Sequence, residues 1–324
     1  MRTITFAAGI ALIATMAQSD TLTVYAPDYF GSQWGPGPAI EAAFETKCGC
    51  DLEYLTGDVM PRLALEGQNT KADVVIGLSQ DETARARGTG LFAPHGVDTA
   101  PLTLPVDWTD TDFLPFDWSY VAFVYDNTKM DGPTSFEALL NLPDETRIVI
   151  QDPRASVSGQ ALLMWVKALY ADDAAGAWER LAPKILTVTK GWSEAYGLFT
   201  DGEADMVLSF TTSPAYHVIA EGDETKSAAI FDEGHYLYVE LAGKIAGTDN
   251  PDLADQFMDF IMTPEFQTII PQGNWSYPAA LDRAQWPQGF QDLPMPDKAI
   301  FFDETKVSEV RSQALDEWRA ALSR

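Results

Sequence analysis

Hydrophobic residues in the first third of the chain form short continuous runs that alternate with stretches of helical spacing. Leu22-Thr-Val-Tyr25 is β-branched and aromatic, which predicts a strand. The Gly35-Pro-Gly-Pro38 turn then leads into a helix that ends at Cys48-Gly49. A short helix over residues 61–67 and a buried strand over residues 73–78 follow. This alternation predicts an α/β fold with a largely parallel sheet and crossover helices.

Two long apolar segments have a different pattern. Phe116–Tyr125 and Tyr236–Ile245 are aromatic and β-branched without a helical period, so each is predicted to be a long strand. Between them lies a second alternating block, with helices expected over 135–142 and 160–170 and strands over 148–151 and 204–210. After these strands the pattern is helical, over 253–262, 264–270 and 306–322.

Long strands on both sides of a middle block predict a chain that passes from one lobe to another and later returns. We expect residues 18–117 and 233–324 to form lobe 1 and residues 118–232 to form lobe 2. The two crossings would act as a two-strand hinge, and the cleft between the lobes would hold a ligand. Two consecutive, independent domains are the alternative that this pattern leaves open.

The composition and charge of the chain indicate which classes of binding partner to expect. The chain has 324 residues, of which 46% are hydrophobic, and 21 basic against 48 acidic side chains give a formal charge of −27. Nucleic acid and an anionic membrane surface are not expected as partners, because both carry negative charge themselves. A cationic small ligand or a basic protein surface is favoured, although adaptation to salt would produce the same composition.

The first residues have the pattern of a secretory signal peptide. Arg2 precedes an apolar run from Ile4 to Met16, and small residues flank a cleavage point after Ala17. We therefore expect residues 1–17 to be a signal peptide rather than a buried helix. The exported chain is expected to be soluble, with no direct membrane insertion.

The two cysteines, Cys48 and Cys50, lie in the exported part of the chain at C-x-C spacing. In an oxidising compartment this pair predicts a small disulfide across Gly49. No His or further Cys lies near the pair in the sequence, so a metal site is not expected there.

The sequence lacks the common motifs of catalysis. Its three His residues show no metal-ligand spacing, and there is no G-x-S-x-G, no G-x-x-x-x-G-K-[ST] and no G-x-G-x-x-G. We expect no enzyme activity and therefore no catalytic residue, cofactor or metal.

Three of the nine Trp residues stand beside turn residues, where an aromatic plane either faces a ligand or packs in a core. Trp34 precedes Gly-Pro-Gly-Pro, Trp192 follows a Lys-Gly pair, and Trp275 lies in the run Gly-Asn-Trp-Ser-Tyr-Pro. These three are candidate ligand contacts.

Two hydroxyl-rich segments follow predicted strands. In residues 151–159, Ser156 or Ser158 either caps the next helix or helps it to bind a phosphate at its N-terminus. In residues 209–216, hydroxyl groups and Tyr216 would line a cleft if the carboxyl end of the strand faces it.

These segments resemble those of the thiamine-binding periplasmic proteins of bacterial ABC importers, over nearly the whole exported chain. The matching stretches are Leu22–Tyr25, Trp34–Pro38, Cys48–Cys50, Lys71–Val75, Gln151–Arg154, Thr187–Phe199, Thr211–His217, Glu233–Tyr236 and Gly273–Trp275. The resemblance implies a two-lobed type 2 periplasmic binding protein fold. It also implies a periplasmic monomer that carries thiamine or thiamine phosphate in the cleft and delivers it to the ABC transporter permease.

The resemblance extends to individual ligand contacts. It assigns Trp34, Trp192, Tyr216 and Trp275 to an aromatic cage and places Ser156 near the phosphate. Two family tyrosines are replaced here, by Pro27 and by Phe210, and Asp58 is the candidate for the carboxylate of the cleft.

Such a cage suits thiamine, which contains a flat cationic thiazolium ring and a flat aminopyrimidine. A polyamine or ferric ion on the same fold is an alternative cargo, although the iron receptors' adjacent Tyr pair is missing because Tyr216 is followed by His217. A secreted thiamine-degrading enzyme is a further alternative, which would need a nucleophile in the cleft.

Overall fold

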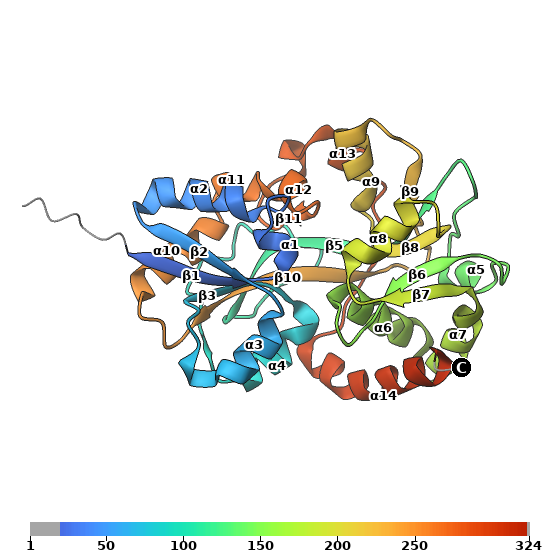
Figure 1. Cartoon of the computed structure of the whole chain (residues 1–324), viewed down its shortest axis with the longest axis horizontal. Coiled ribbons are helices and arrows are strands. Elements are labelled where there is room, and N and C mark those ends of the chain that lie inside the picture. Colours follow the sequence, from blue (N-terminus) through green and yellow to red (C-terminus); the bar gives the residue numbers. More distant parts are fainter. Residues whose placement is uncertain (1–19, 323–324) are drawn as a thin grey trace, which may run out of the picture.

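The computed structural model describes residues 20–322 and contains two lobes that lie side by side (Figure 1). The predicted signal peptide, residues 1–17, lies outside the described residues. Within the described part, none of the helices combines the length and the apolar character needed to cross a membrane.

One continuous set of strands runs through both lobes, in the order β2-β1-β3-β10-β5-β8-β6-β7. The bounds along this path are β2 Asp51–Thr56, β1 Thr21–Ala26, β3 Val74–Ser79, β10 His235–Ile245, β5 Phe113–Asp126, β8 Met206–Phe210, β6 Ile148–Gln151 and β7 Ile185–Thr189. Four short strands lie beside it, namely β4 Phe92–Ala93, β9 Lys226–Ala228, β11 Tyr277–Pro278 and β12 Ala299–Ile300. Strands β1, β2 and β3 are parallel, as are β6, β7 and β8, which confirms the predicted alternation in each lobe.

The long strand β5 belongs to both lobes. Residues 113–120 pair with β10 in the first sheet, and from Val121 onward the same strand pairs with β8 in the second sheet. Both long strands were predicted from their aromatic content, within three residues of their observed ends. The chain therefore crosses between lobes along β5 and returns along β10, as a type 2 periplasmic binding protein fold requires.

Helices cover both faces of each sheet. In the first lobe they are α1 Asp28–Gly31, α2 Gly37–Cys48, α3 Val59–Glu66, α4 Thr83–Gly88, α10 Pro251–Ile261, α11 Pro264–Gln267, α12 Ile270–Gly273 and α13 Gln288–Gln291. The second lobe contains α5 Phe136–Leu140, α6 Val157–Tyr170, α7 Ala174–Leu181, α8 Trp192–Thr200 and α9 Ser213–Tyr216, and the chain ends in α14 Glu304–Leu322. Cys48 and Cys50 form the predicted disulfide at the end of α2, where Gly49 has a positive φ of 67°.

Two local features differ from the predicted pattern. The helix expected over 264–270 is divided into α11 and α12, and Pro271 in the first turn of α12 lacks an N–H that could continue a longer helix. The last helix, α14, was assigned to lobe 1, but its apolar side chains pack in the second lobe's core around α6 and α7. The remaining lobe boundaries stay a prediction.

The segment that leads into α14 contacts both cores. Phe301 packs against the first lobe, beside Trp108, while Phe302 packs in the second lobe's core, beside Tyr236. The chain thus crosses between the lobes a third time, with neighbouring side chains on opposite sides.

Candidate functional site

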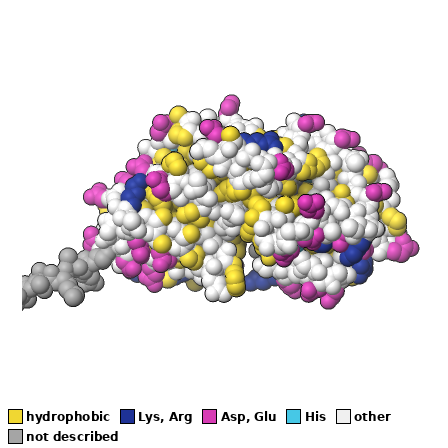
Figure 2. Space-filling view, turned by 90° about the horizontal axis from the view of Figure 1, so that it is seen from above, with side chains coloured by type: hydrophobic (Ala, Val, Ile, Leu, Met, Phe, Trp, Pro, Cys, Tyr) yellow, Lys and Arg dark blue, Asp and Glu magenta, His cyan; other side chains and the backbone are white. Residues whose placement is uncertain are grey.

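Exposed aromatic side chains gather where the two lobes meet. Tyr29 of α1 and Trp34 belong to the first lobe, and Trp192 of α8 and Tyr216 of α9 belong to the second; Trp34 is 80% exposed. In Figure 1 the helices α1 and α8 lie near the centre of the view, with α12 and α9 above them. Figure 2, which is seen from above, shows hydrophobic side chains along the middle of the molecule and many acidic side chains around its edge. Large exposed aromatic surfaces at a lobe junction indicate a binding site.

Five aromatic rings form a connected string in this region. Trp192 stacks on Tyr196 with ring centroids 4.6 Å apart, and Tyr196 stacks on His217 at 5.9 Å. Tyr216 lies 5.2 Å from His217 and meets Trp275 edge-to-face at 5.1 Å. The structure therefore links three of the four predicted cage residues through two rings, those of Tyr196 and His217, that the sequence analysis missed.

Trp192 is held at the start of α8 by its indole nitrogen. The indole N–H donates to Ser209 Oγ at 2.7 Å, and Ser209 Oγ lies 2.7 Å from Ser213 Oγ. Although it was expected in a loop, Trp192 is the first residue of the helix and remains 40% exposed. One face of its ring is therefore fixed by Tyr196 and the other is available to a ligand.

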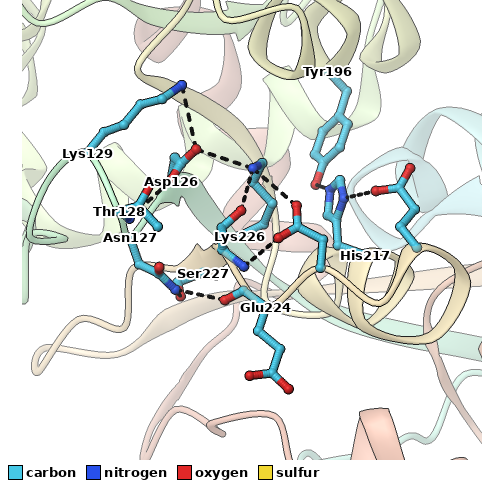
Figure 3. A network of polar contacts seen from close by, with 12 residues as sticks. Asp126, Asn127, Thr128, Lys129, Tyr196, His217, Glu224, Lys226 and Ser227 are labelled. Atoms are coloured by element: carbon cyan, nitrogen blue, oxygen red, sulfur yellow. Dashed lines mark hydrogen bonds and ion pairs between the residues drawn. The ribbon is translucent and has the colours of Figure 1, made fainter.

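The buried His217 begins a single turn of π-helix, His217–Glu221, directly after Tyr216. Its Nδ1 lies 2.7 Å from Glu221, and its Nε2 lies 3.0 Å from the Tyr196 hydroxyl (Figure 3). π-Helical turns are rare and are found frequently at functional sites. Here the turn locks the imidazole between Tyr196 and Tyr216.

The same turn contains a group of possible metal ligands, which no sequence motif had indicated. Donor atoms of His217, Glu221 and Asp223 lie within 4.8 Å of one another. However, the Lys226 ammonium lies 3.4 Å from Asp223 and also contacts Asp126 (Figure 3). A cationic side chain already neutralises Asp223, and Glu221 is bonded to His217, so we assign no metal to the group.

Trp275 has an unusual backbone conformation. Its φ is +52°, a left-handed value that costs energy for a bulky side chain and is often found at ligand clamps. The ring is enclosed by Tyr216 at one edge and by Phe290, which is parallel to it within 12° at 6.3 Å. These contacts hold Trp275 in a conformation that its own backbone disfavours.

A buried pair of acidic side chains lies beneath the aromatic residues. Asp117 of β5 and Glu240 of β10 face each other in register and are 0% and 3% exposed. The Asn274 amide donates to Asp117 at 2.6 Å and to Glu240 at 2.5 Å. Since Asn274 precedes Trp275, the same loop carries a predicted cage residue and the amide that binds both acids.

Two tyrosine hydroxyls also donate to Glu240. One is Tyr29 of α1, whose ring is 40% exposed, and the other is Tyr238 of β10, at 2.9 Å. Burial raises the pKa of Glu240, and it raises the pKa of Asp117 well above its usual value with a further contribution from the Glu240 charge. Burial and the same carboxylate raise the pKa values of both tyrosines, which therefore remain hydrogen-bond donors.

The acidic pair was not predicted, although one sequence signal points to it. Asp117 and Glu240 each interrupt an apolar run that was itself predicted to be a long strand. Burying an acidic side chain inside such a run costs free energy unless the carboxyl group is hydrogen-bonded or paired. Pro27, which replaces a family tyrosine, is followed two residues later by Tyr29, whose hydroxyl reaches this pair.

The other predicted contacts are placed but not joined to the string. Phe210 packs on Tyr238 with centroids 5.2 Å apart. Ser156 occupies the N-cap position of α6, but its hydroxyl contacts Ser158 at 2.9 Å rather than a helix N–H. Asp58 is exposed at the start of α3 and does not cap it, and Trp34 contacts no other ring within residues 20–322.

Two lobes joined by long strands, with aromatic side chains and buried acids at their junction, define the class of two-lobed solute-binding proteins. The family of bacterial extracellular solute-binding proteins matches residues 39–295. The thiamine-binding periplasmic protein of Escherichia coli strain K12 is 46% identical over 308 residues, which is 94% of each chain. That of Brucella suis biovar 1 is 42% identical over 321 residues, covering 97% of this chain and 96% of the relative.

A solved structure supports the same relationship. It is a periplasmic thiamin binding protein with a TM-score of 0.90 and 45% identity, covering 94% of this chain and 96% of the other. The chain therefore belongs to the thiamine-binding periplasmic proteins, within the bacterial extracellular solute-binding family.

Proposed function

We propose that this protein is the periplasmic receptor of a bacterial thiamine importer. The observation that supports this most is the aromatic string from Trp192 to Trp275, which lies beside a buried acidic pair. Flat rings and negative charge together suit a flat cation, and thiamine is the ligand named for the relatives.

The energetics of such a site are sufficient for a receptor. An indole face contributes on the order of 2 kcal/mol to a cation when water is excluded. Nanomolar affinity corresponds to about −12 kcal/mol, which several rings, buried area and a complementary carboxylate would supply together.

The proposed ligand contacts are the seven residues assigned from the family resemblance. Trp34, Trp192, Phe210, Tyr216 and Trp275 supply ring surfaces; Asp58 supplies a carboxylate, and Ser156 at the start of α6 meets a phosphate tail. Lobe closure around the ligand would present a new surface of a monomeric receptor to the membrane permease.

Titration of the exported chain with thiamine, followed by Trp fluorescence and by calorimetry, tests this proposal. A saturable response with a dissociation constant in the nanomolar range is expected. The absence of any response at micromolar thiamine would refute it. Spermidine and ferric citrate serve as competing ligands, and stronger binding of either would replace thiamine as the cargo.

The proposed role is transport rather than catalysis, as is the role of the related binding proteins. Mass analysis after prolonged incubation with thiamine separates the two roles. A receptor returns the vitamin intact, whereas a thiamine-degrading enzyme releases its pyrimidine and thiazole parts.

A further inference from the structure

The pair formed by Asp117 and Glu240 has a property that a simple structural contact lacks. The two carboxyl groups face each other in register between β5 and β10, and the single amide nitrogen of Asn274 contacts both, at 2.6 Å and 2.5 Å. Two carboxylates held this close and out of water repel each other, which favours a state in which one of the two groups is protonated. Two buried carboxyl groups at hydrogen-bond distance commonly share a single proton in this way.

Within the described part of the chain, the surroundings of the pair contain no compensating positive charge. The groups that face it are Tyr29 from α1, Tyr238 from β10 and Asn274 after α12. All three donate hydrogen bonds and are neutral. Among residues 20–322, neither carboxyl group forms an ion pair with Lys, Arg or His, although the protein has many such pairs elsewhere.

The pair is coupled to the proposed ligand site by two short connections. Asn274 joins both carboxyl groups to the backbone of Trp275. Tyr238 joins Glu240 to Phe210, because its hydroxyl binds the carboxylate while its ring packs on the phenyl group. A cation held by these aromatic residues would therefore lie near a buried acidic pair in which one of the two carboxyl groups is protonated.

We infer that the Asp117–Glu240 pair holds one shared proton in the unliganded protein and releases it to solvent when a permanently cationic ligand binds. This inference rests on the proposed function and adds to it a charge-selection mechanism. A bound cation favours the doubly ionised pair, so the ligand's charge replaces the proton's charge. A neutral molecule of the same shape cannot do so, and the site would select for fixed positive charge as well as for flat rings.

The direction of the pH effect follows from this exchange. Burial raises both carboxyl pKa values in the free protein, and the bound cation lowers them. Between the bound-state and free-state values, binding releases a proton, so affinity rises with pH there by up to about tenfold per pH unit. Outside that interval affinity is independent of pH, apart from other titrating groups.

Calorimetry in two buffers measures the proton directly. Thiamine is titrated into the protein in Tris and in phosphate at the same pH, from about pH 6 to pH 9. The difference in heat, divided by the difference in buffer ionisation enthalpy, gives the number of protons released. We expect a maximum between about 0.5 and 1 proton per thiamine, and no release with 3-deazathiamine, a neutral isostere.

Variants assign the proton to the pair. Asp117→Asn keeps a polar side chain but needs no shared proton, so proton release should disappear. Tyr29→Phe removes a hydrogen bond that lowers the pKa of Glu240, so the release maximum should move to higher pH. The matched control is Asp81→Asn, which removes another buried carboxyl whose pKa is raised to about 7 and which is bonded to Tyr236 of β10. This control should release the wild-type number of protons.

The outcomes separate the inference from the proposed function. If thiamine produces no binding heat, the proposed function fails. If thiamine binds without buffer-dependent heat, or if Asp117→Asn or 3-deazathiamine still releases the proton, the inference is wrong. If loss of release follows Asp81→Asn instead, the proton belongs to that carboxyl. If Asp117→Asn fails to fold, the Tyr29→Phe variant decides. If the pH of maximal proton release is the same in Tyr29→Phe as in the wild type, the inference is wrong.

Discussion

The aromatic string and the acidic pair are two halves of one junction, and they are built on opposite principles. The string, from Trp192 to Trp275, consists of rings that touch one another, and two of them, Trp192 and Tyr216, are exposed. The pair, Asp117 and Glu240, is buried and accepts hydrogen bonds from Asn274 and Tyr238. Rings provide contact area with little sensitivity to pH, whereas buried acids provide charge whose amount depends on pH.

This difference predicts which changes affect which property. Truncation of a ring should lower affinity and leave the pH dependence as it is. Replacement of an acid should alter the pH dependence first. The four predictions below test this separation.

The largest effect is expected from Trp275→Ala. This change removes the ring between Tyr216 and Phe290 and with it one face of the predicted cage. We expect thiamine affinity to fall about 30-fold, which corresponds to the roughly 2 kcal/mol of one desolvated cation–π contact. Calorimetry measures the loss. Trp108→Phe, at a ring outside the string, should bind as the wild type does, and equal losses in both variants would contradict the cage assignment.

Trp192→Ala should lower affinity by more than tenfold, somewhat less than Trp275→Ala. It removes the exposed face stacked on Tyr196. Trp192→Phe separates the ring from its N–H, because phenylalanine retains a ring but loses the bond to Ser209. The Phe variant should lose about threefold, as expected for one hydrogen bond. If Ala and Phe bind equally, the ring face carries no affinity.

The third prediction concerns Asp117→Asn and protein stability. Both carboxyl pKa values are raised, so the folded protein retains a proton that the unfolded chain has released above its ordinary values of 3.8 and 4.5. That contribution is complete at low pH and is lost as pH rises through the folded-state values. The variant should therefore lose less stability between about pH 5 and pH 8. At pH 8 we expect it to melt about 2–4 °C above the wild type, or roughly 1 kcal/mol.

A ring variant provides the contrast for this measurement. Thermal unfolding of Trp192→Ala should follow the same pH slope as the wild type, whatever its absolute melting temperature. An altered slope in Trp192→Ala, or an unaltered one in Asp117→Asn, would remove the distinction between the two regions.

The smallest effect is expected from Ser156→Ala. Its hydroxyl does not cap α6, so its loss should leave stability nearly unchanged. Affinity for thiamine monophosphate should fall about threefold, because one hydrogen bond to the phosphate is lost, while affinity for thiamine stays the same. Ser158→Ala is the neighbouring comparison, since that hydroxyl binds Gln151. A loss for unphosphorylated thiamine would move Ser156 away from the phosphate.

The contrast between the aromatic string and the acidic pair also explains which features could be predicted from the sequence. Phe116–Tyr125 and Tyr236–Ile245 were predictable as strands, because their apolar runs are a local property. The pairing of Asp117 with Glu240 was not, because it depends on the register between strands more than a hundred residues apart. Three Trp residues next to turns were visible as candidates, and the resemblance placed Tyr216 with them in one cage.

The connections between those candidates required the structure. Tyr196 and His217 were not among the candidates from the sequence, and only the fold shows that their rings bridge Trp192 and Tyr216. Tyr29 was overlooked because the resemblance points to position 27, where a proline stands. When a side chain reaches the same place from a neighbouring position, comparing the sequence with the family position by position does not reveal it.

Phe301 and Phe302 are adjacent in the chain, yet their side chains pack in the cores of different lobes. The lobes are therefore joined at three places, along β5, along β10 and through this segment, and not by two strands alone. Any change in the angle between the lobes would have to be accommodated at all three connections.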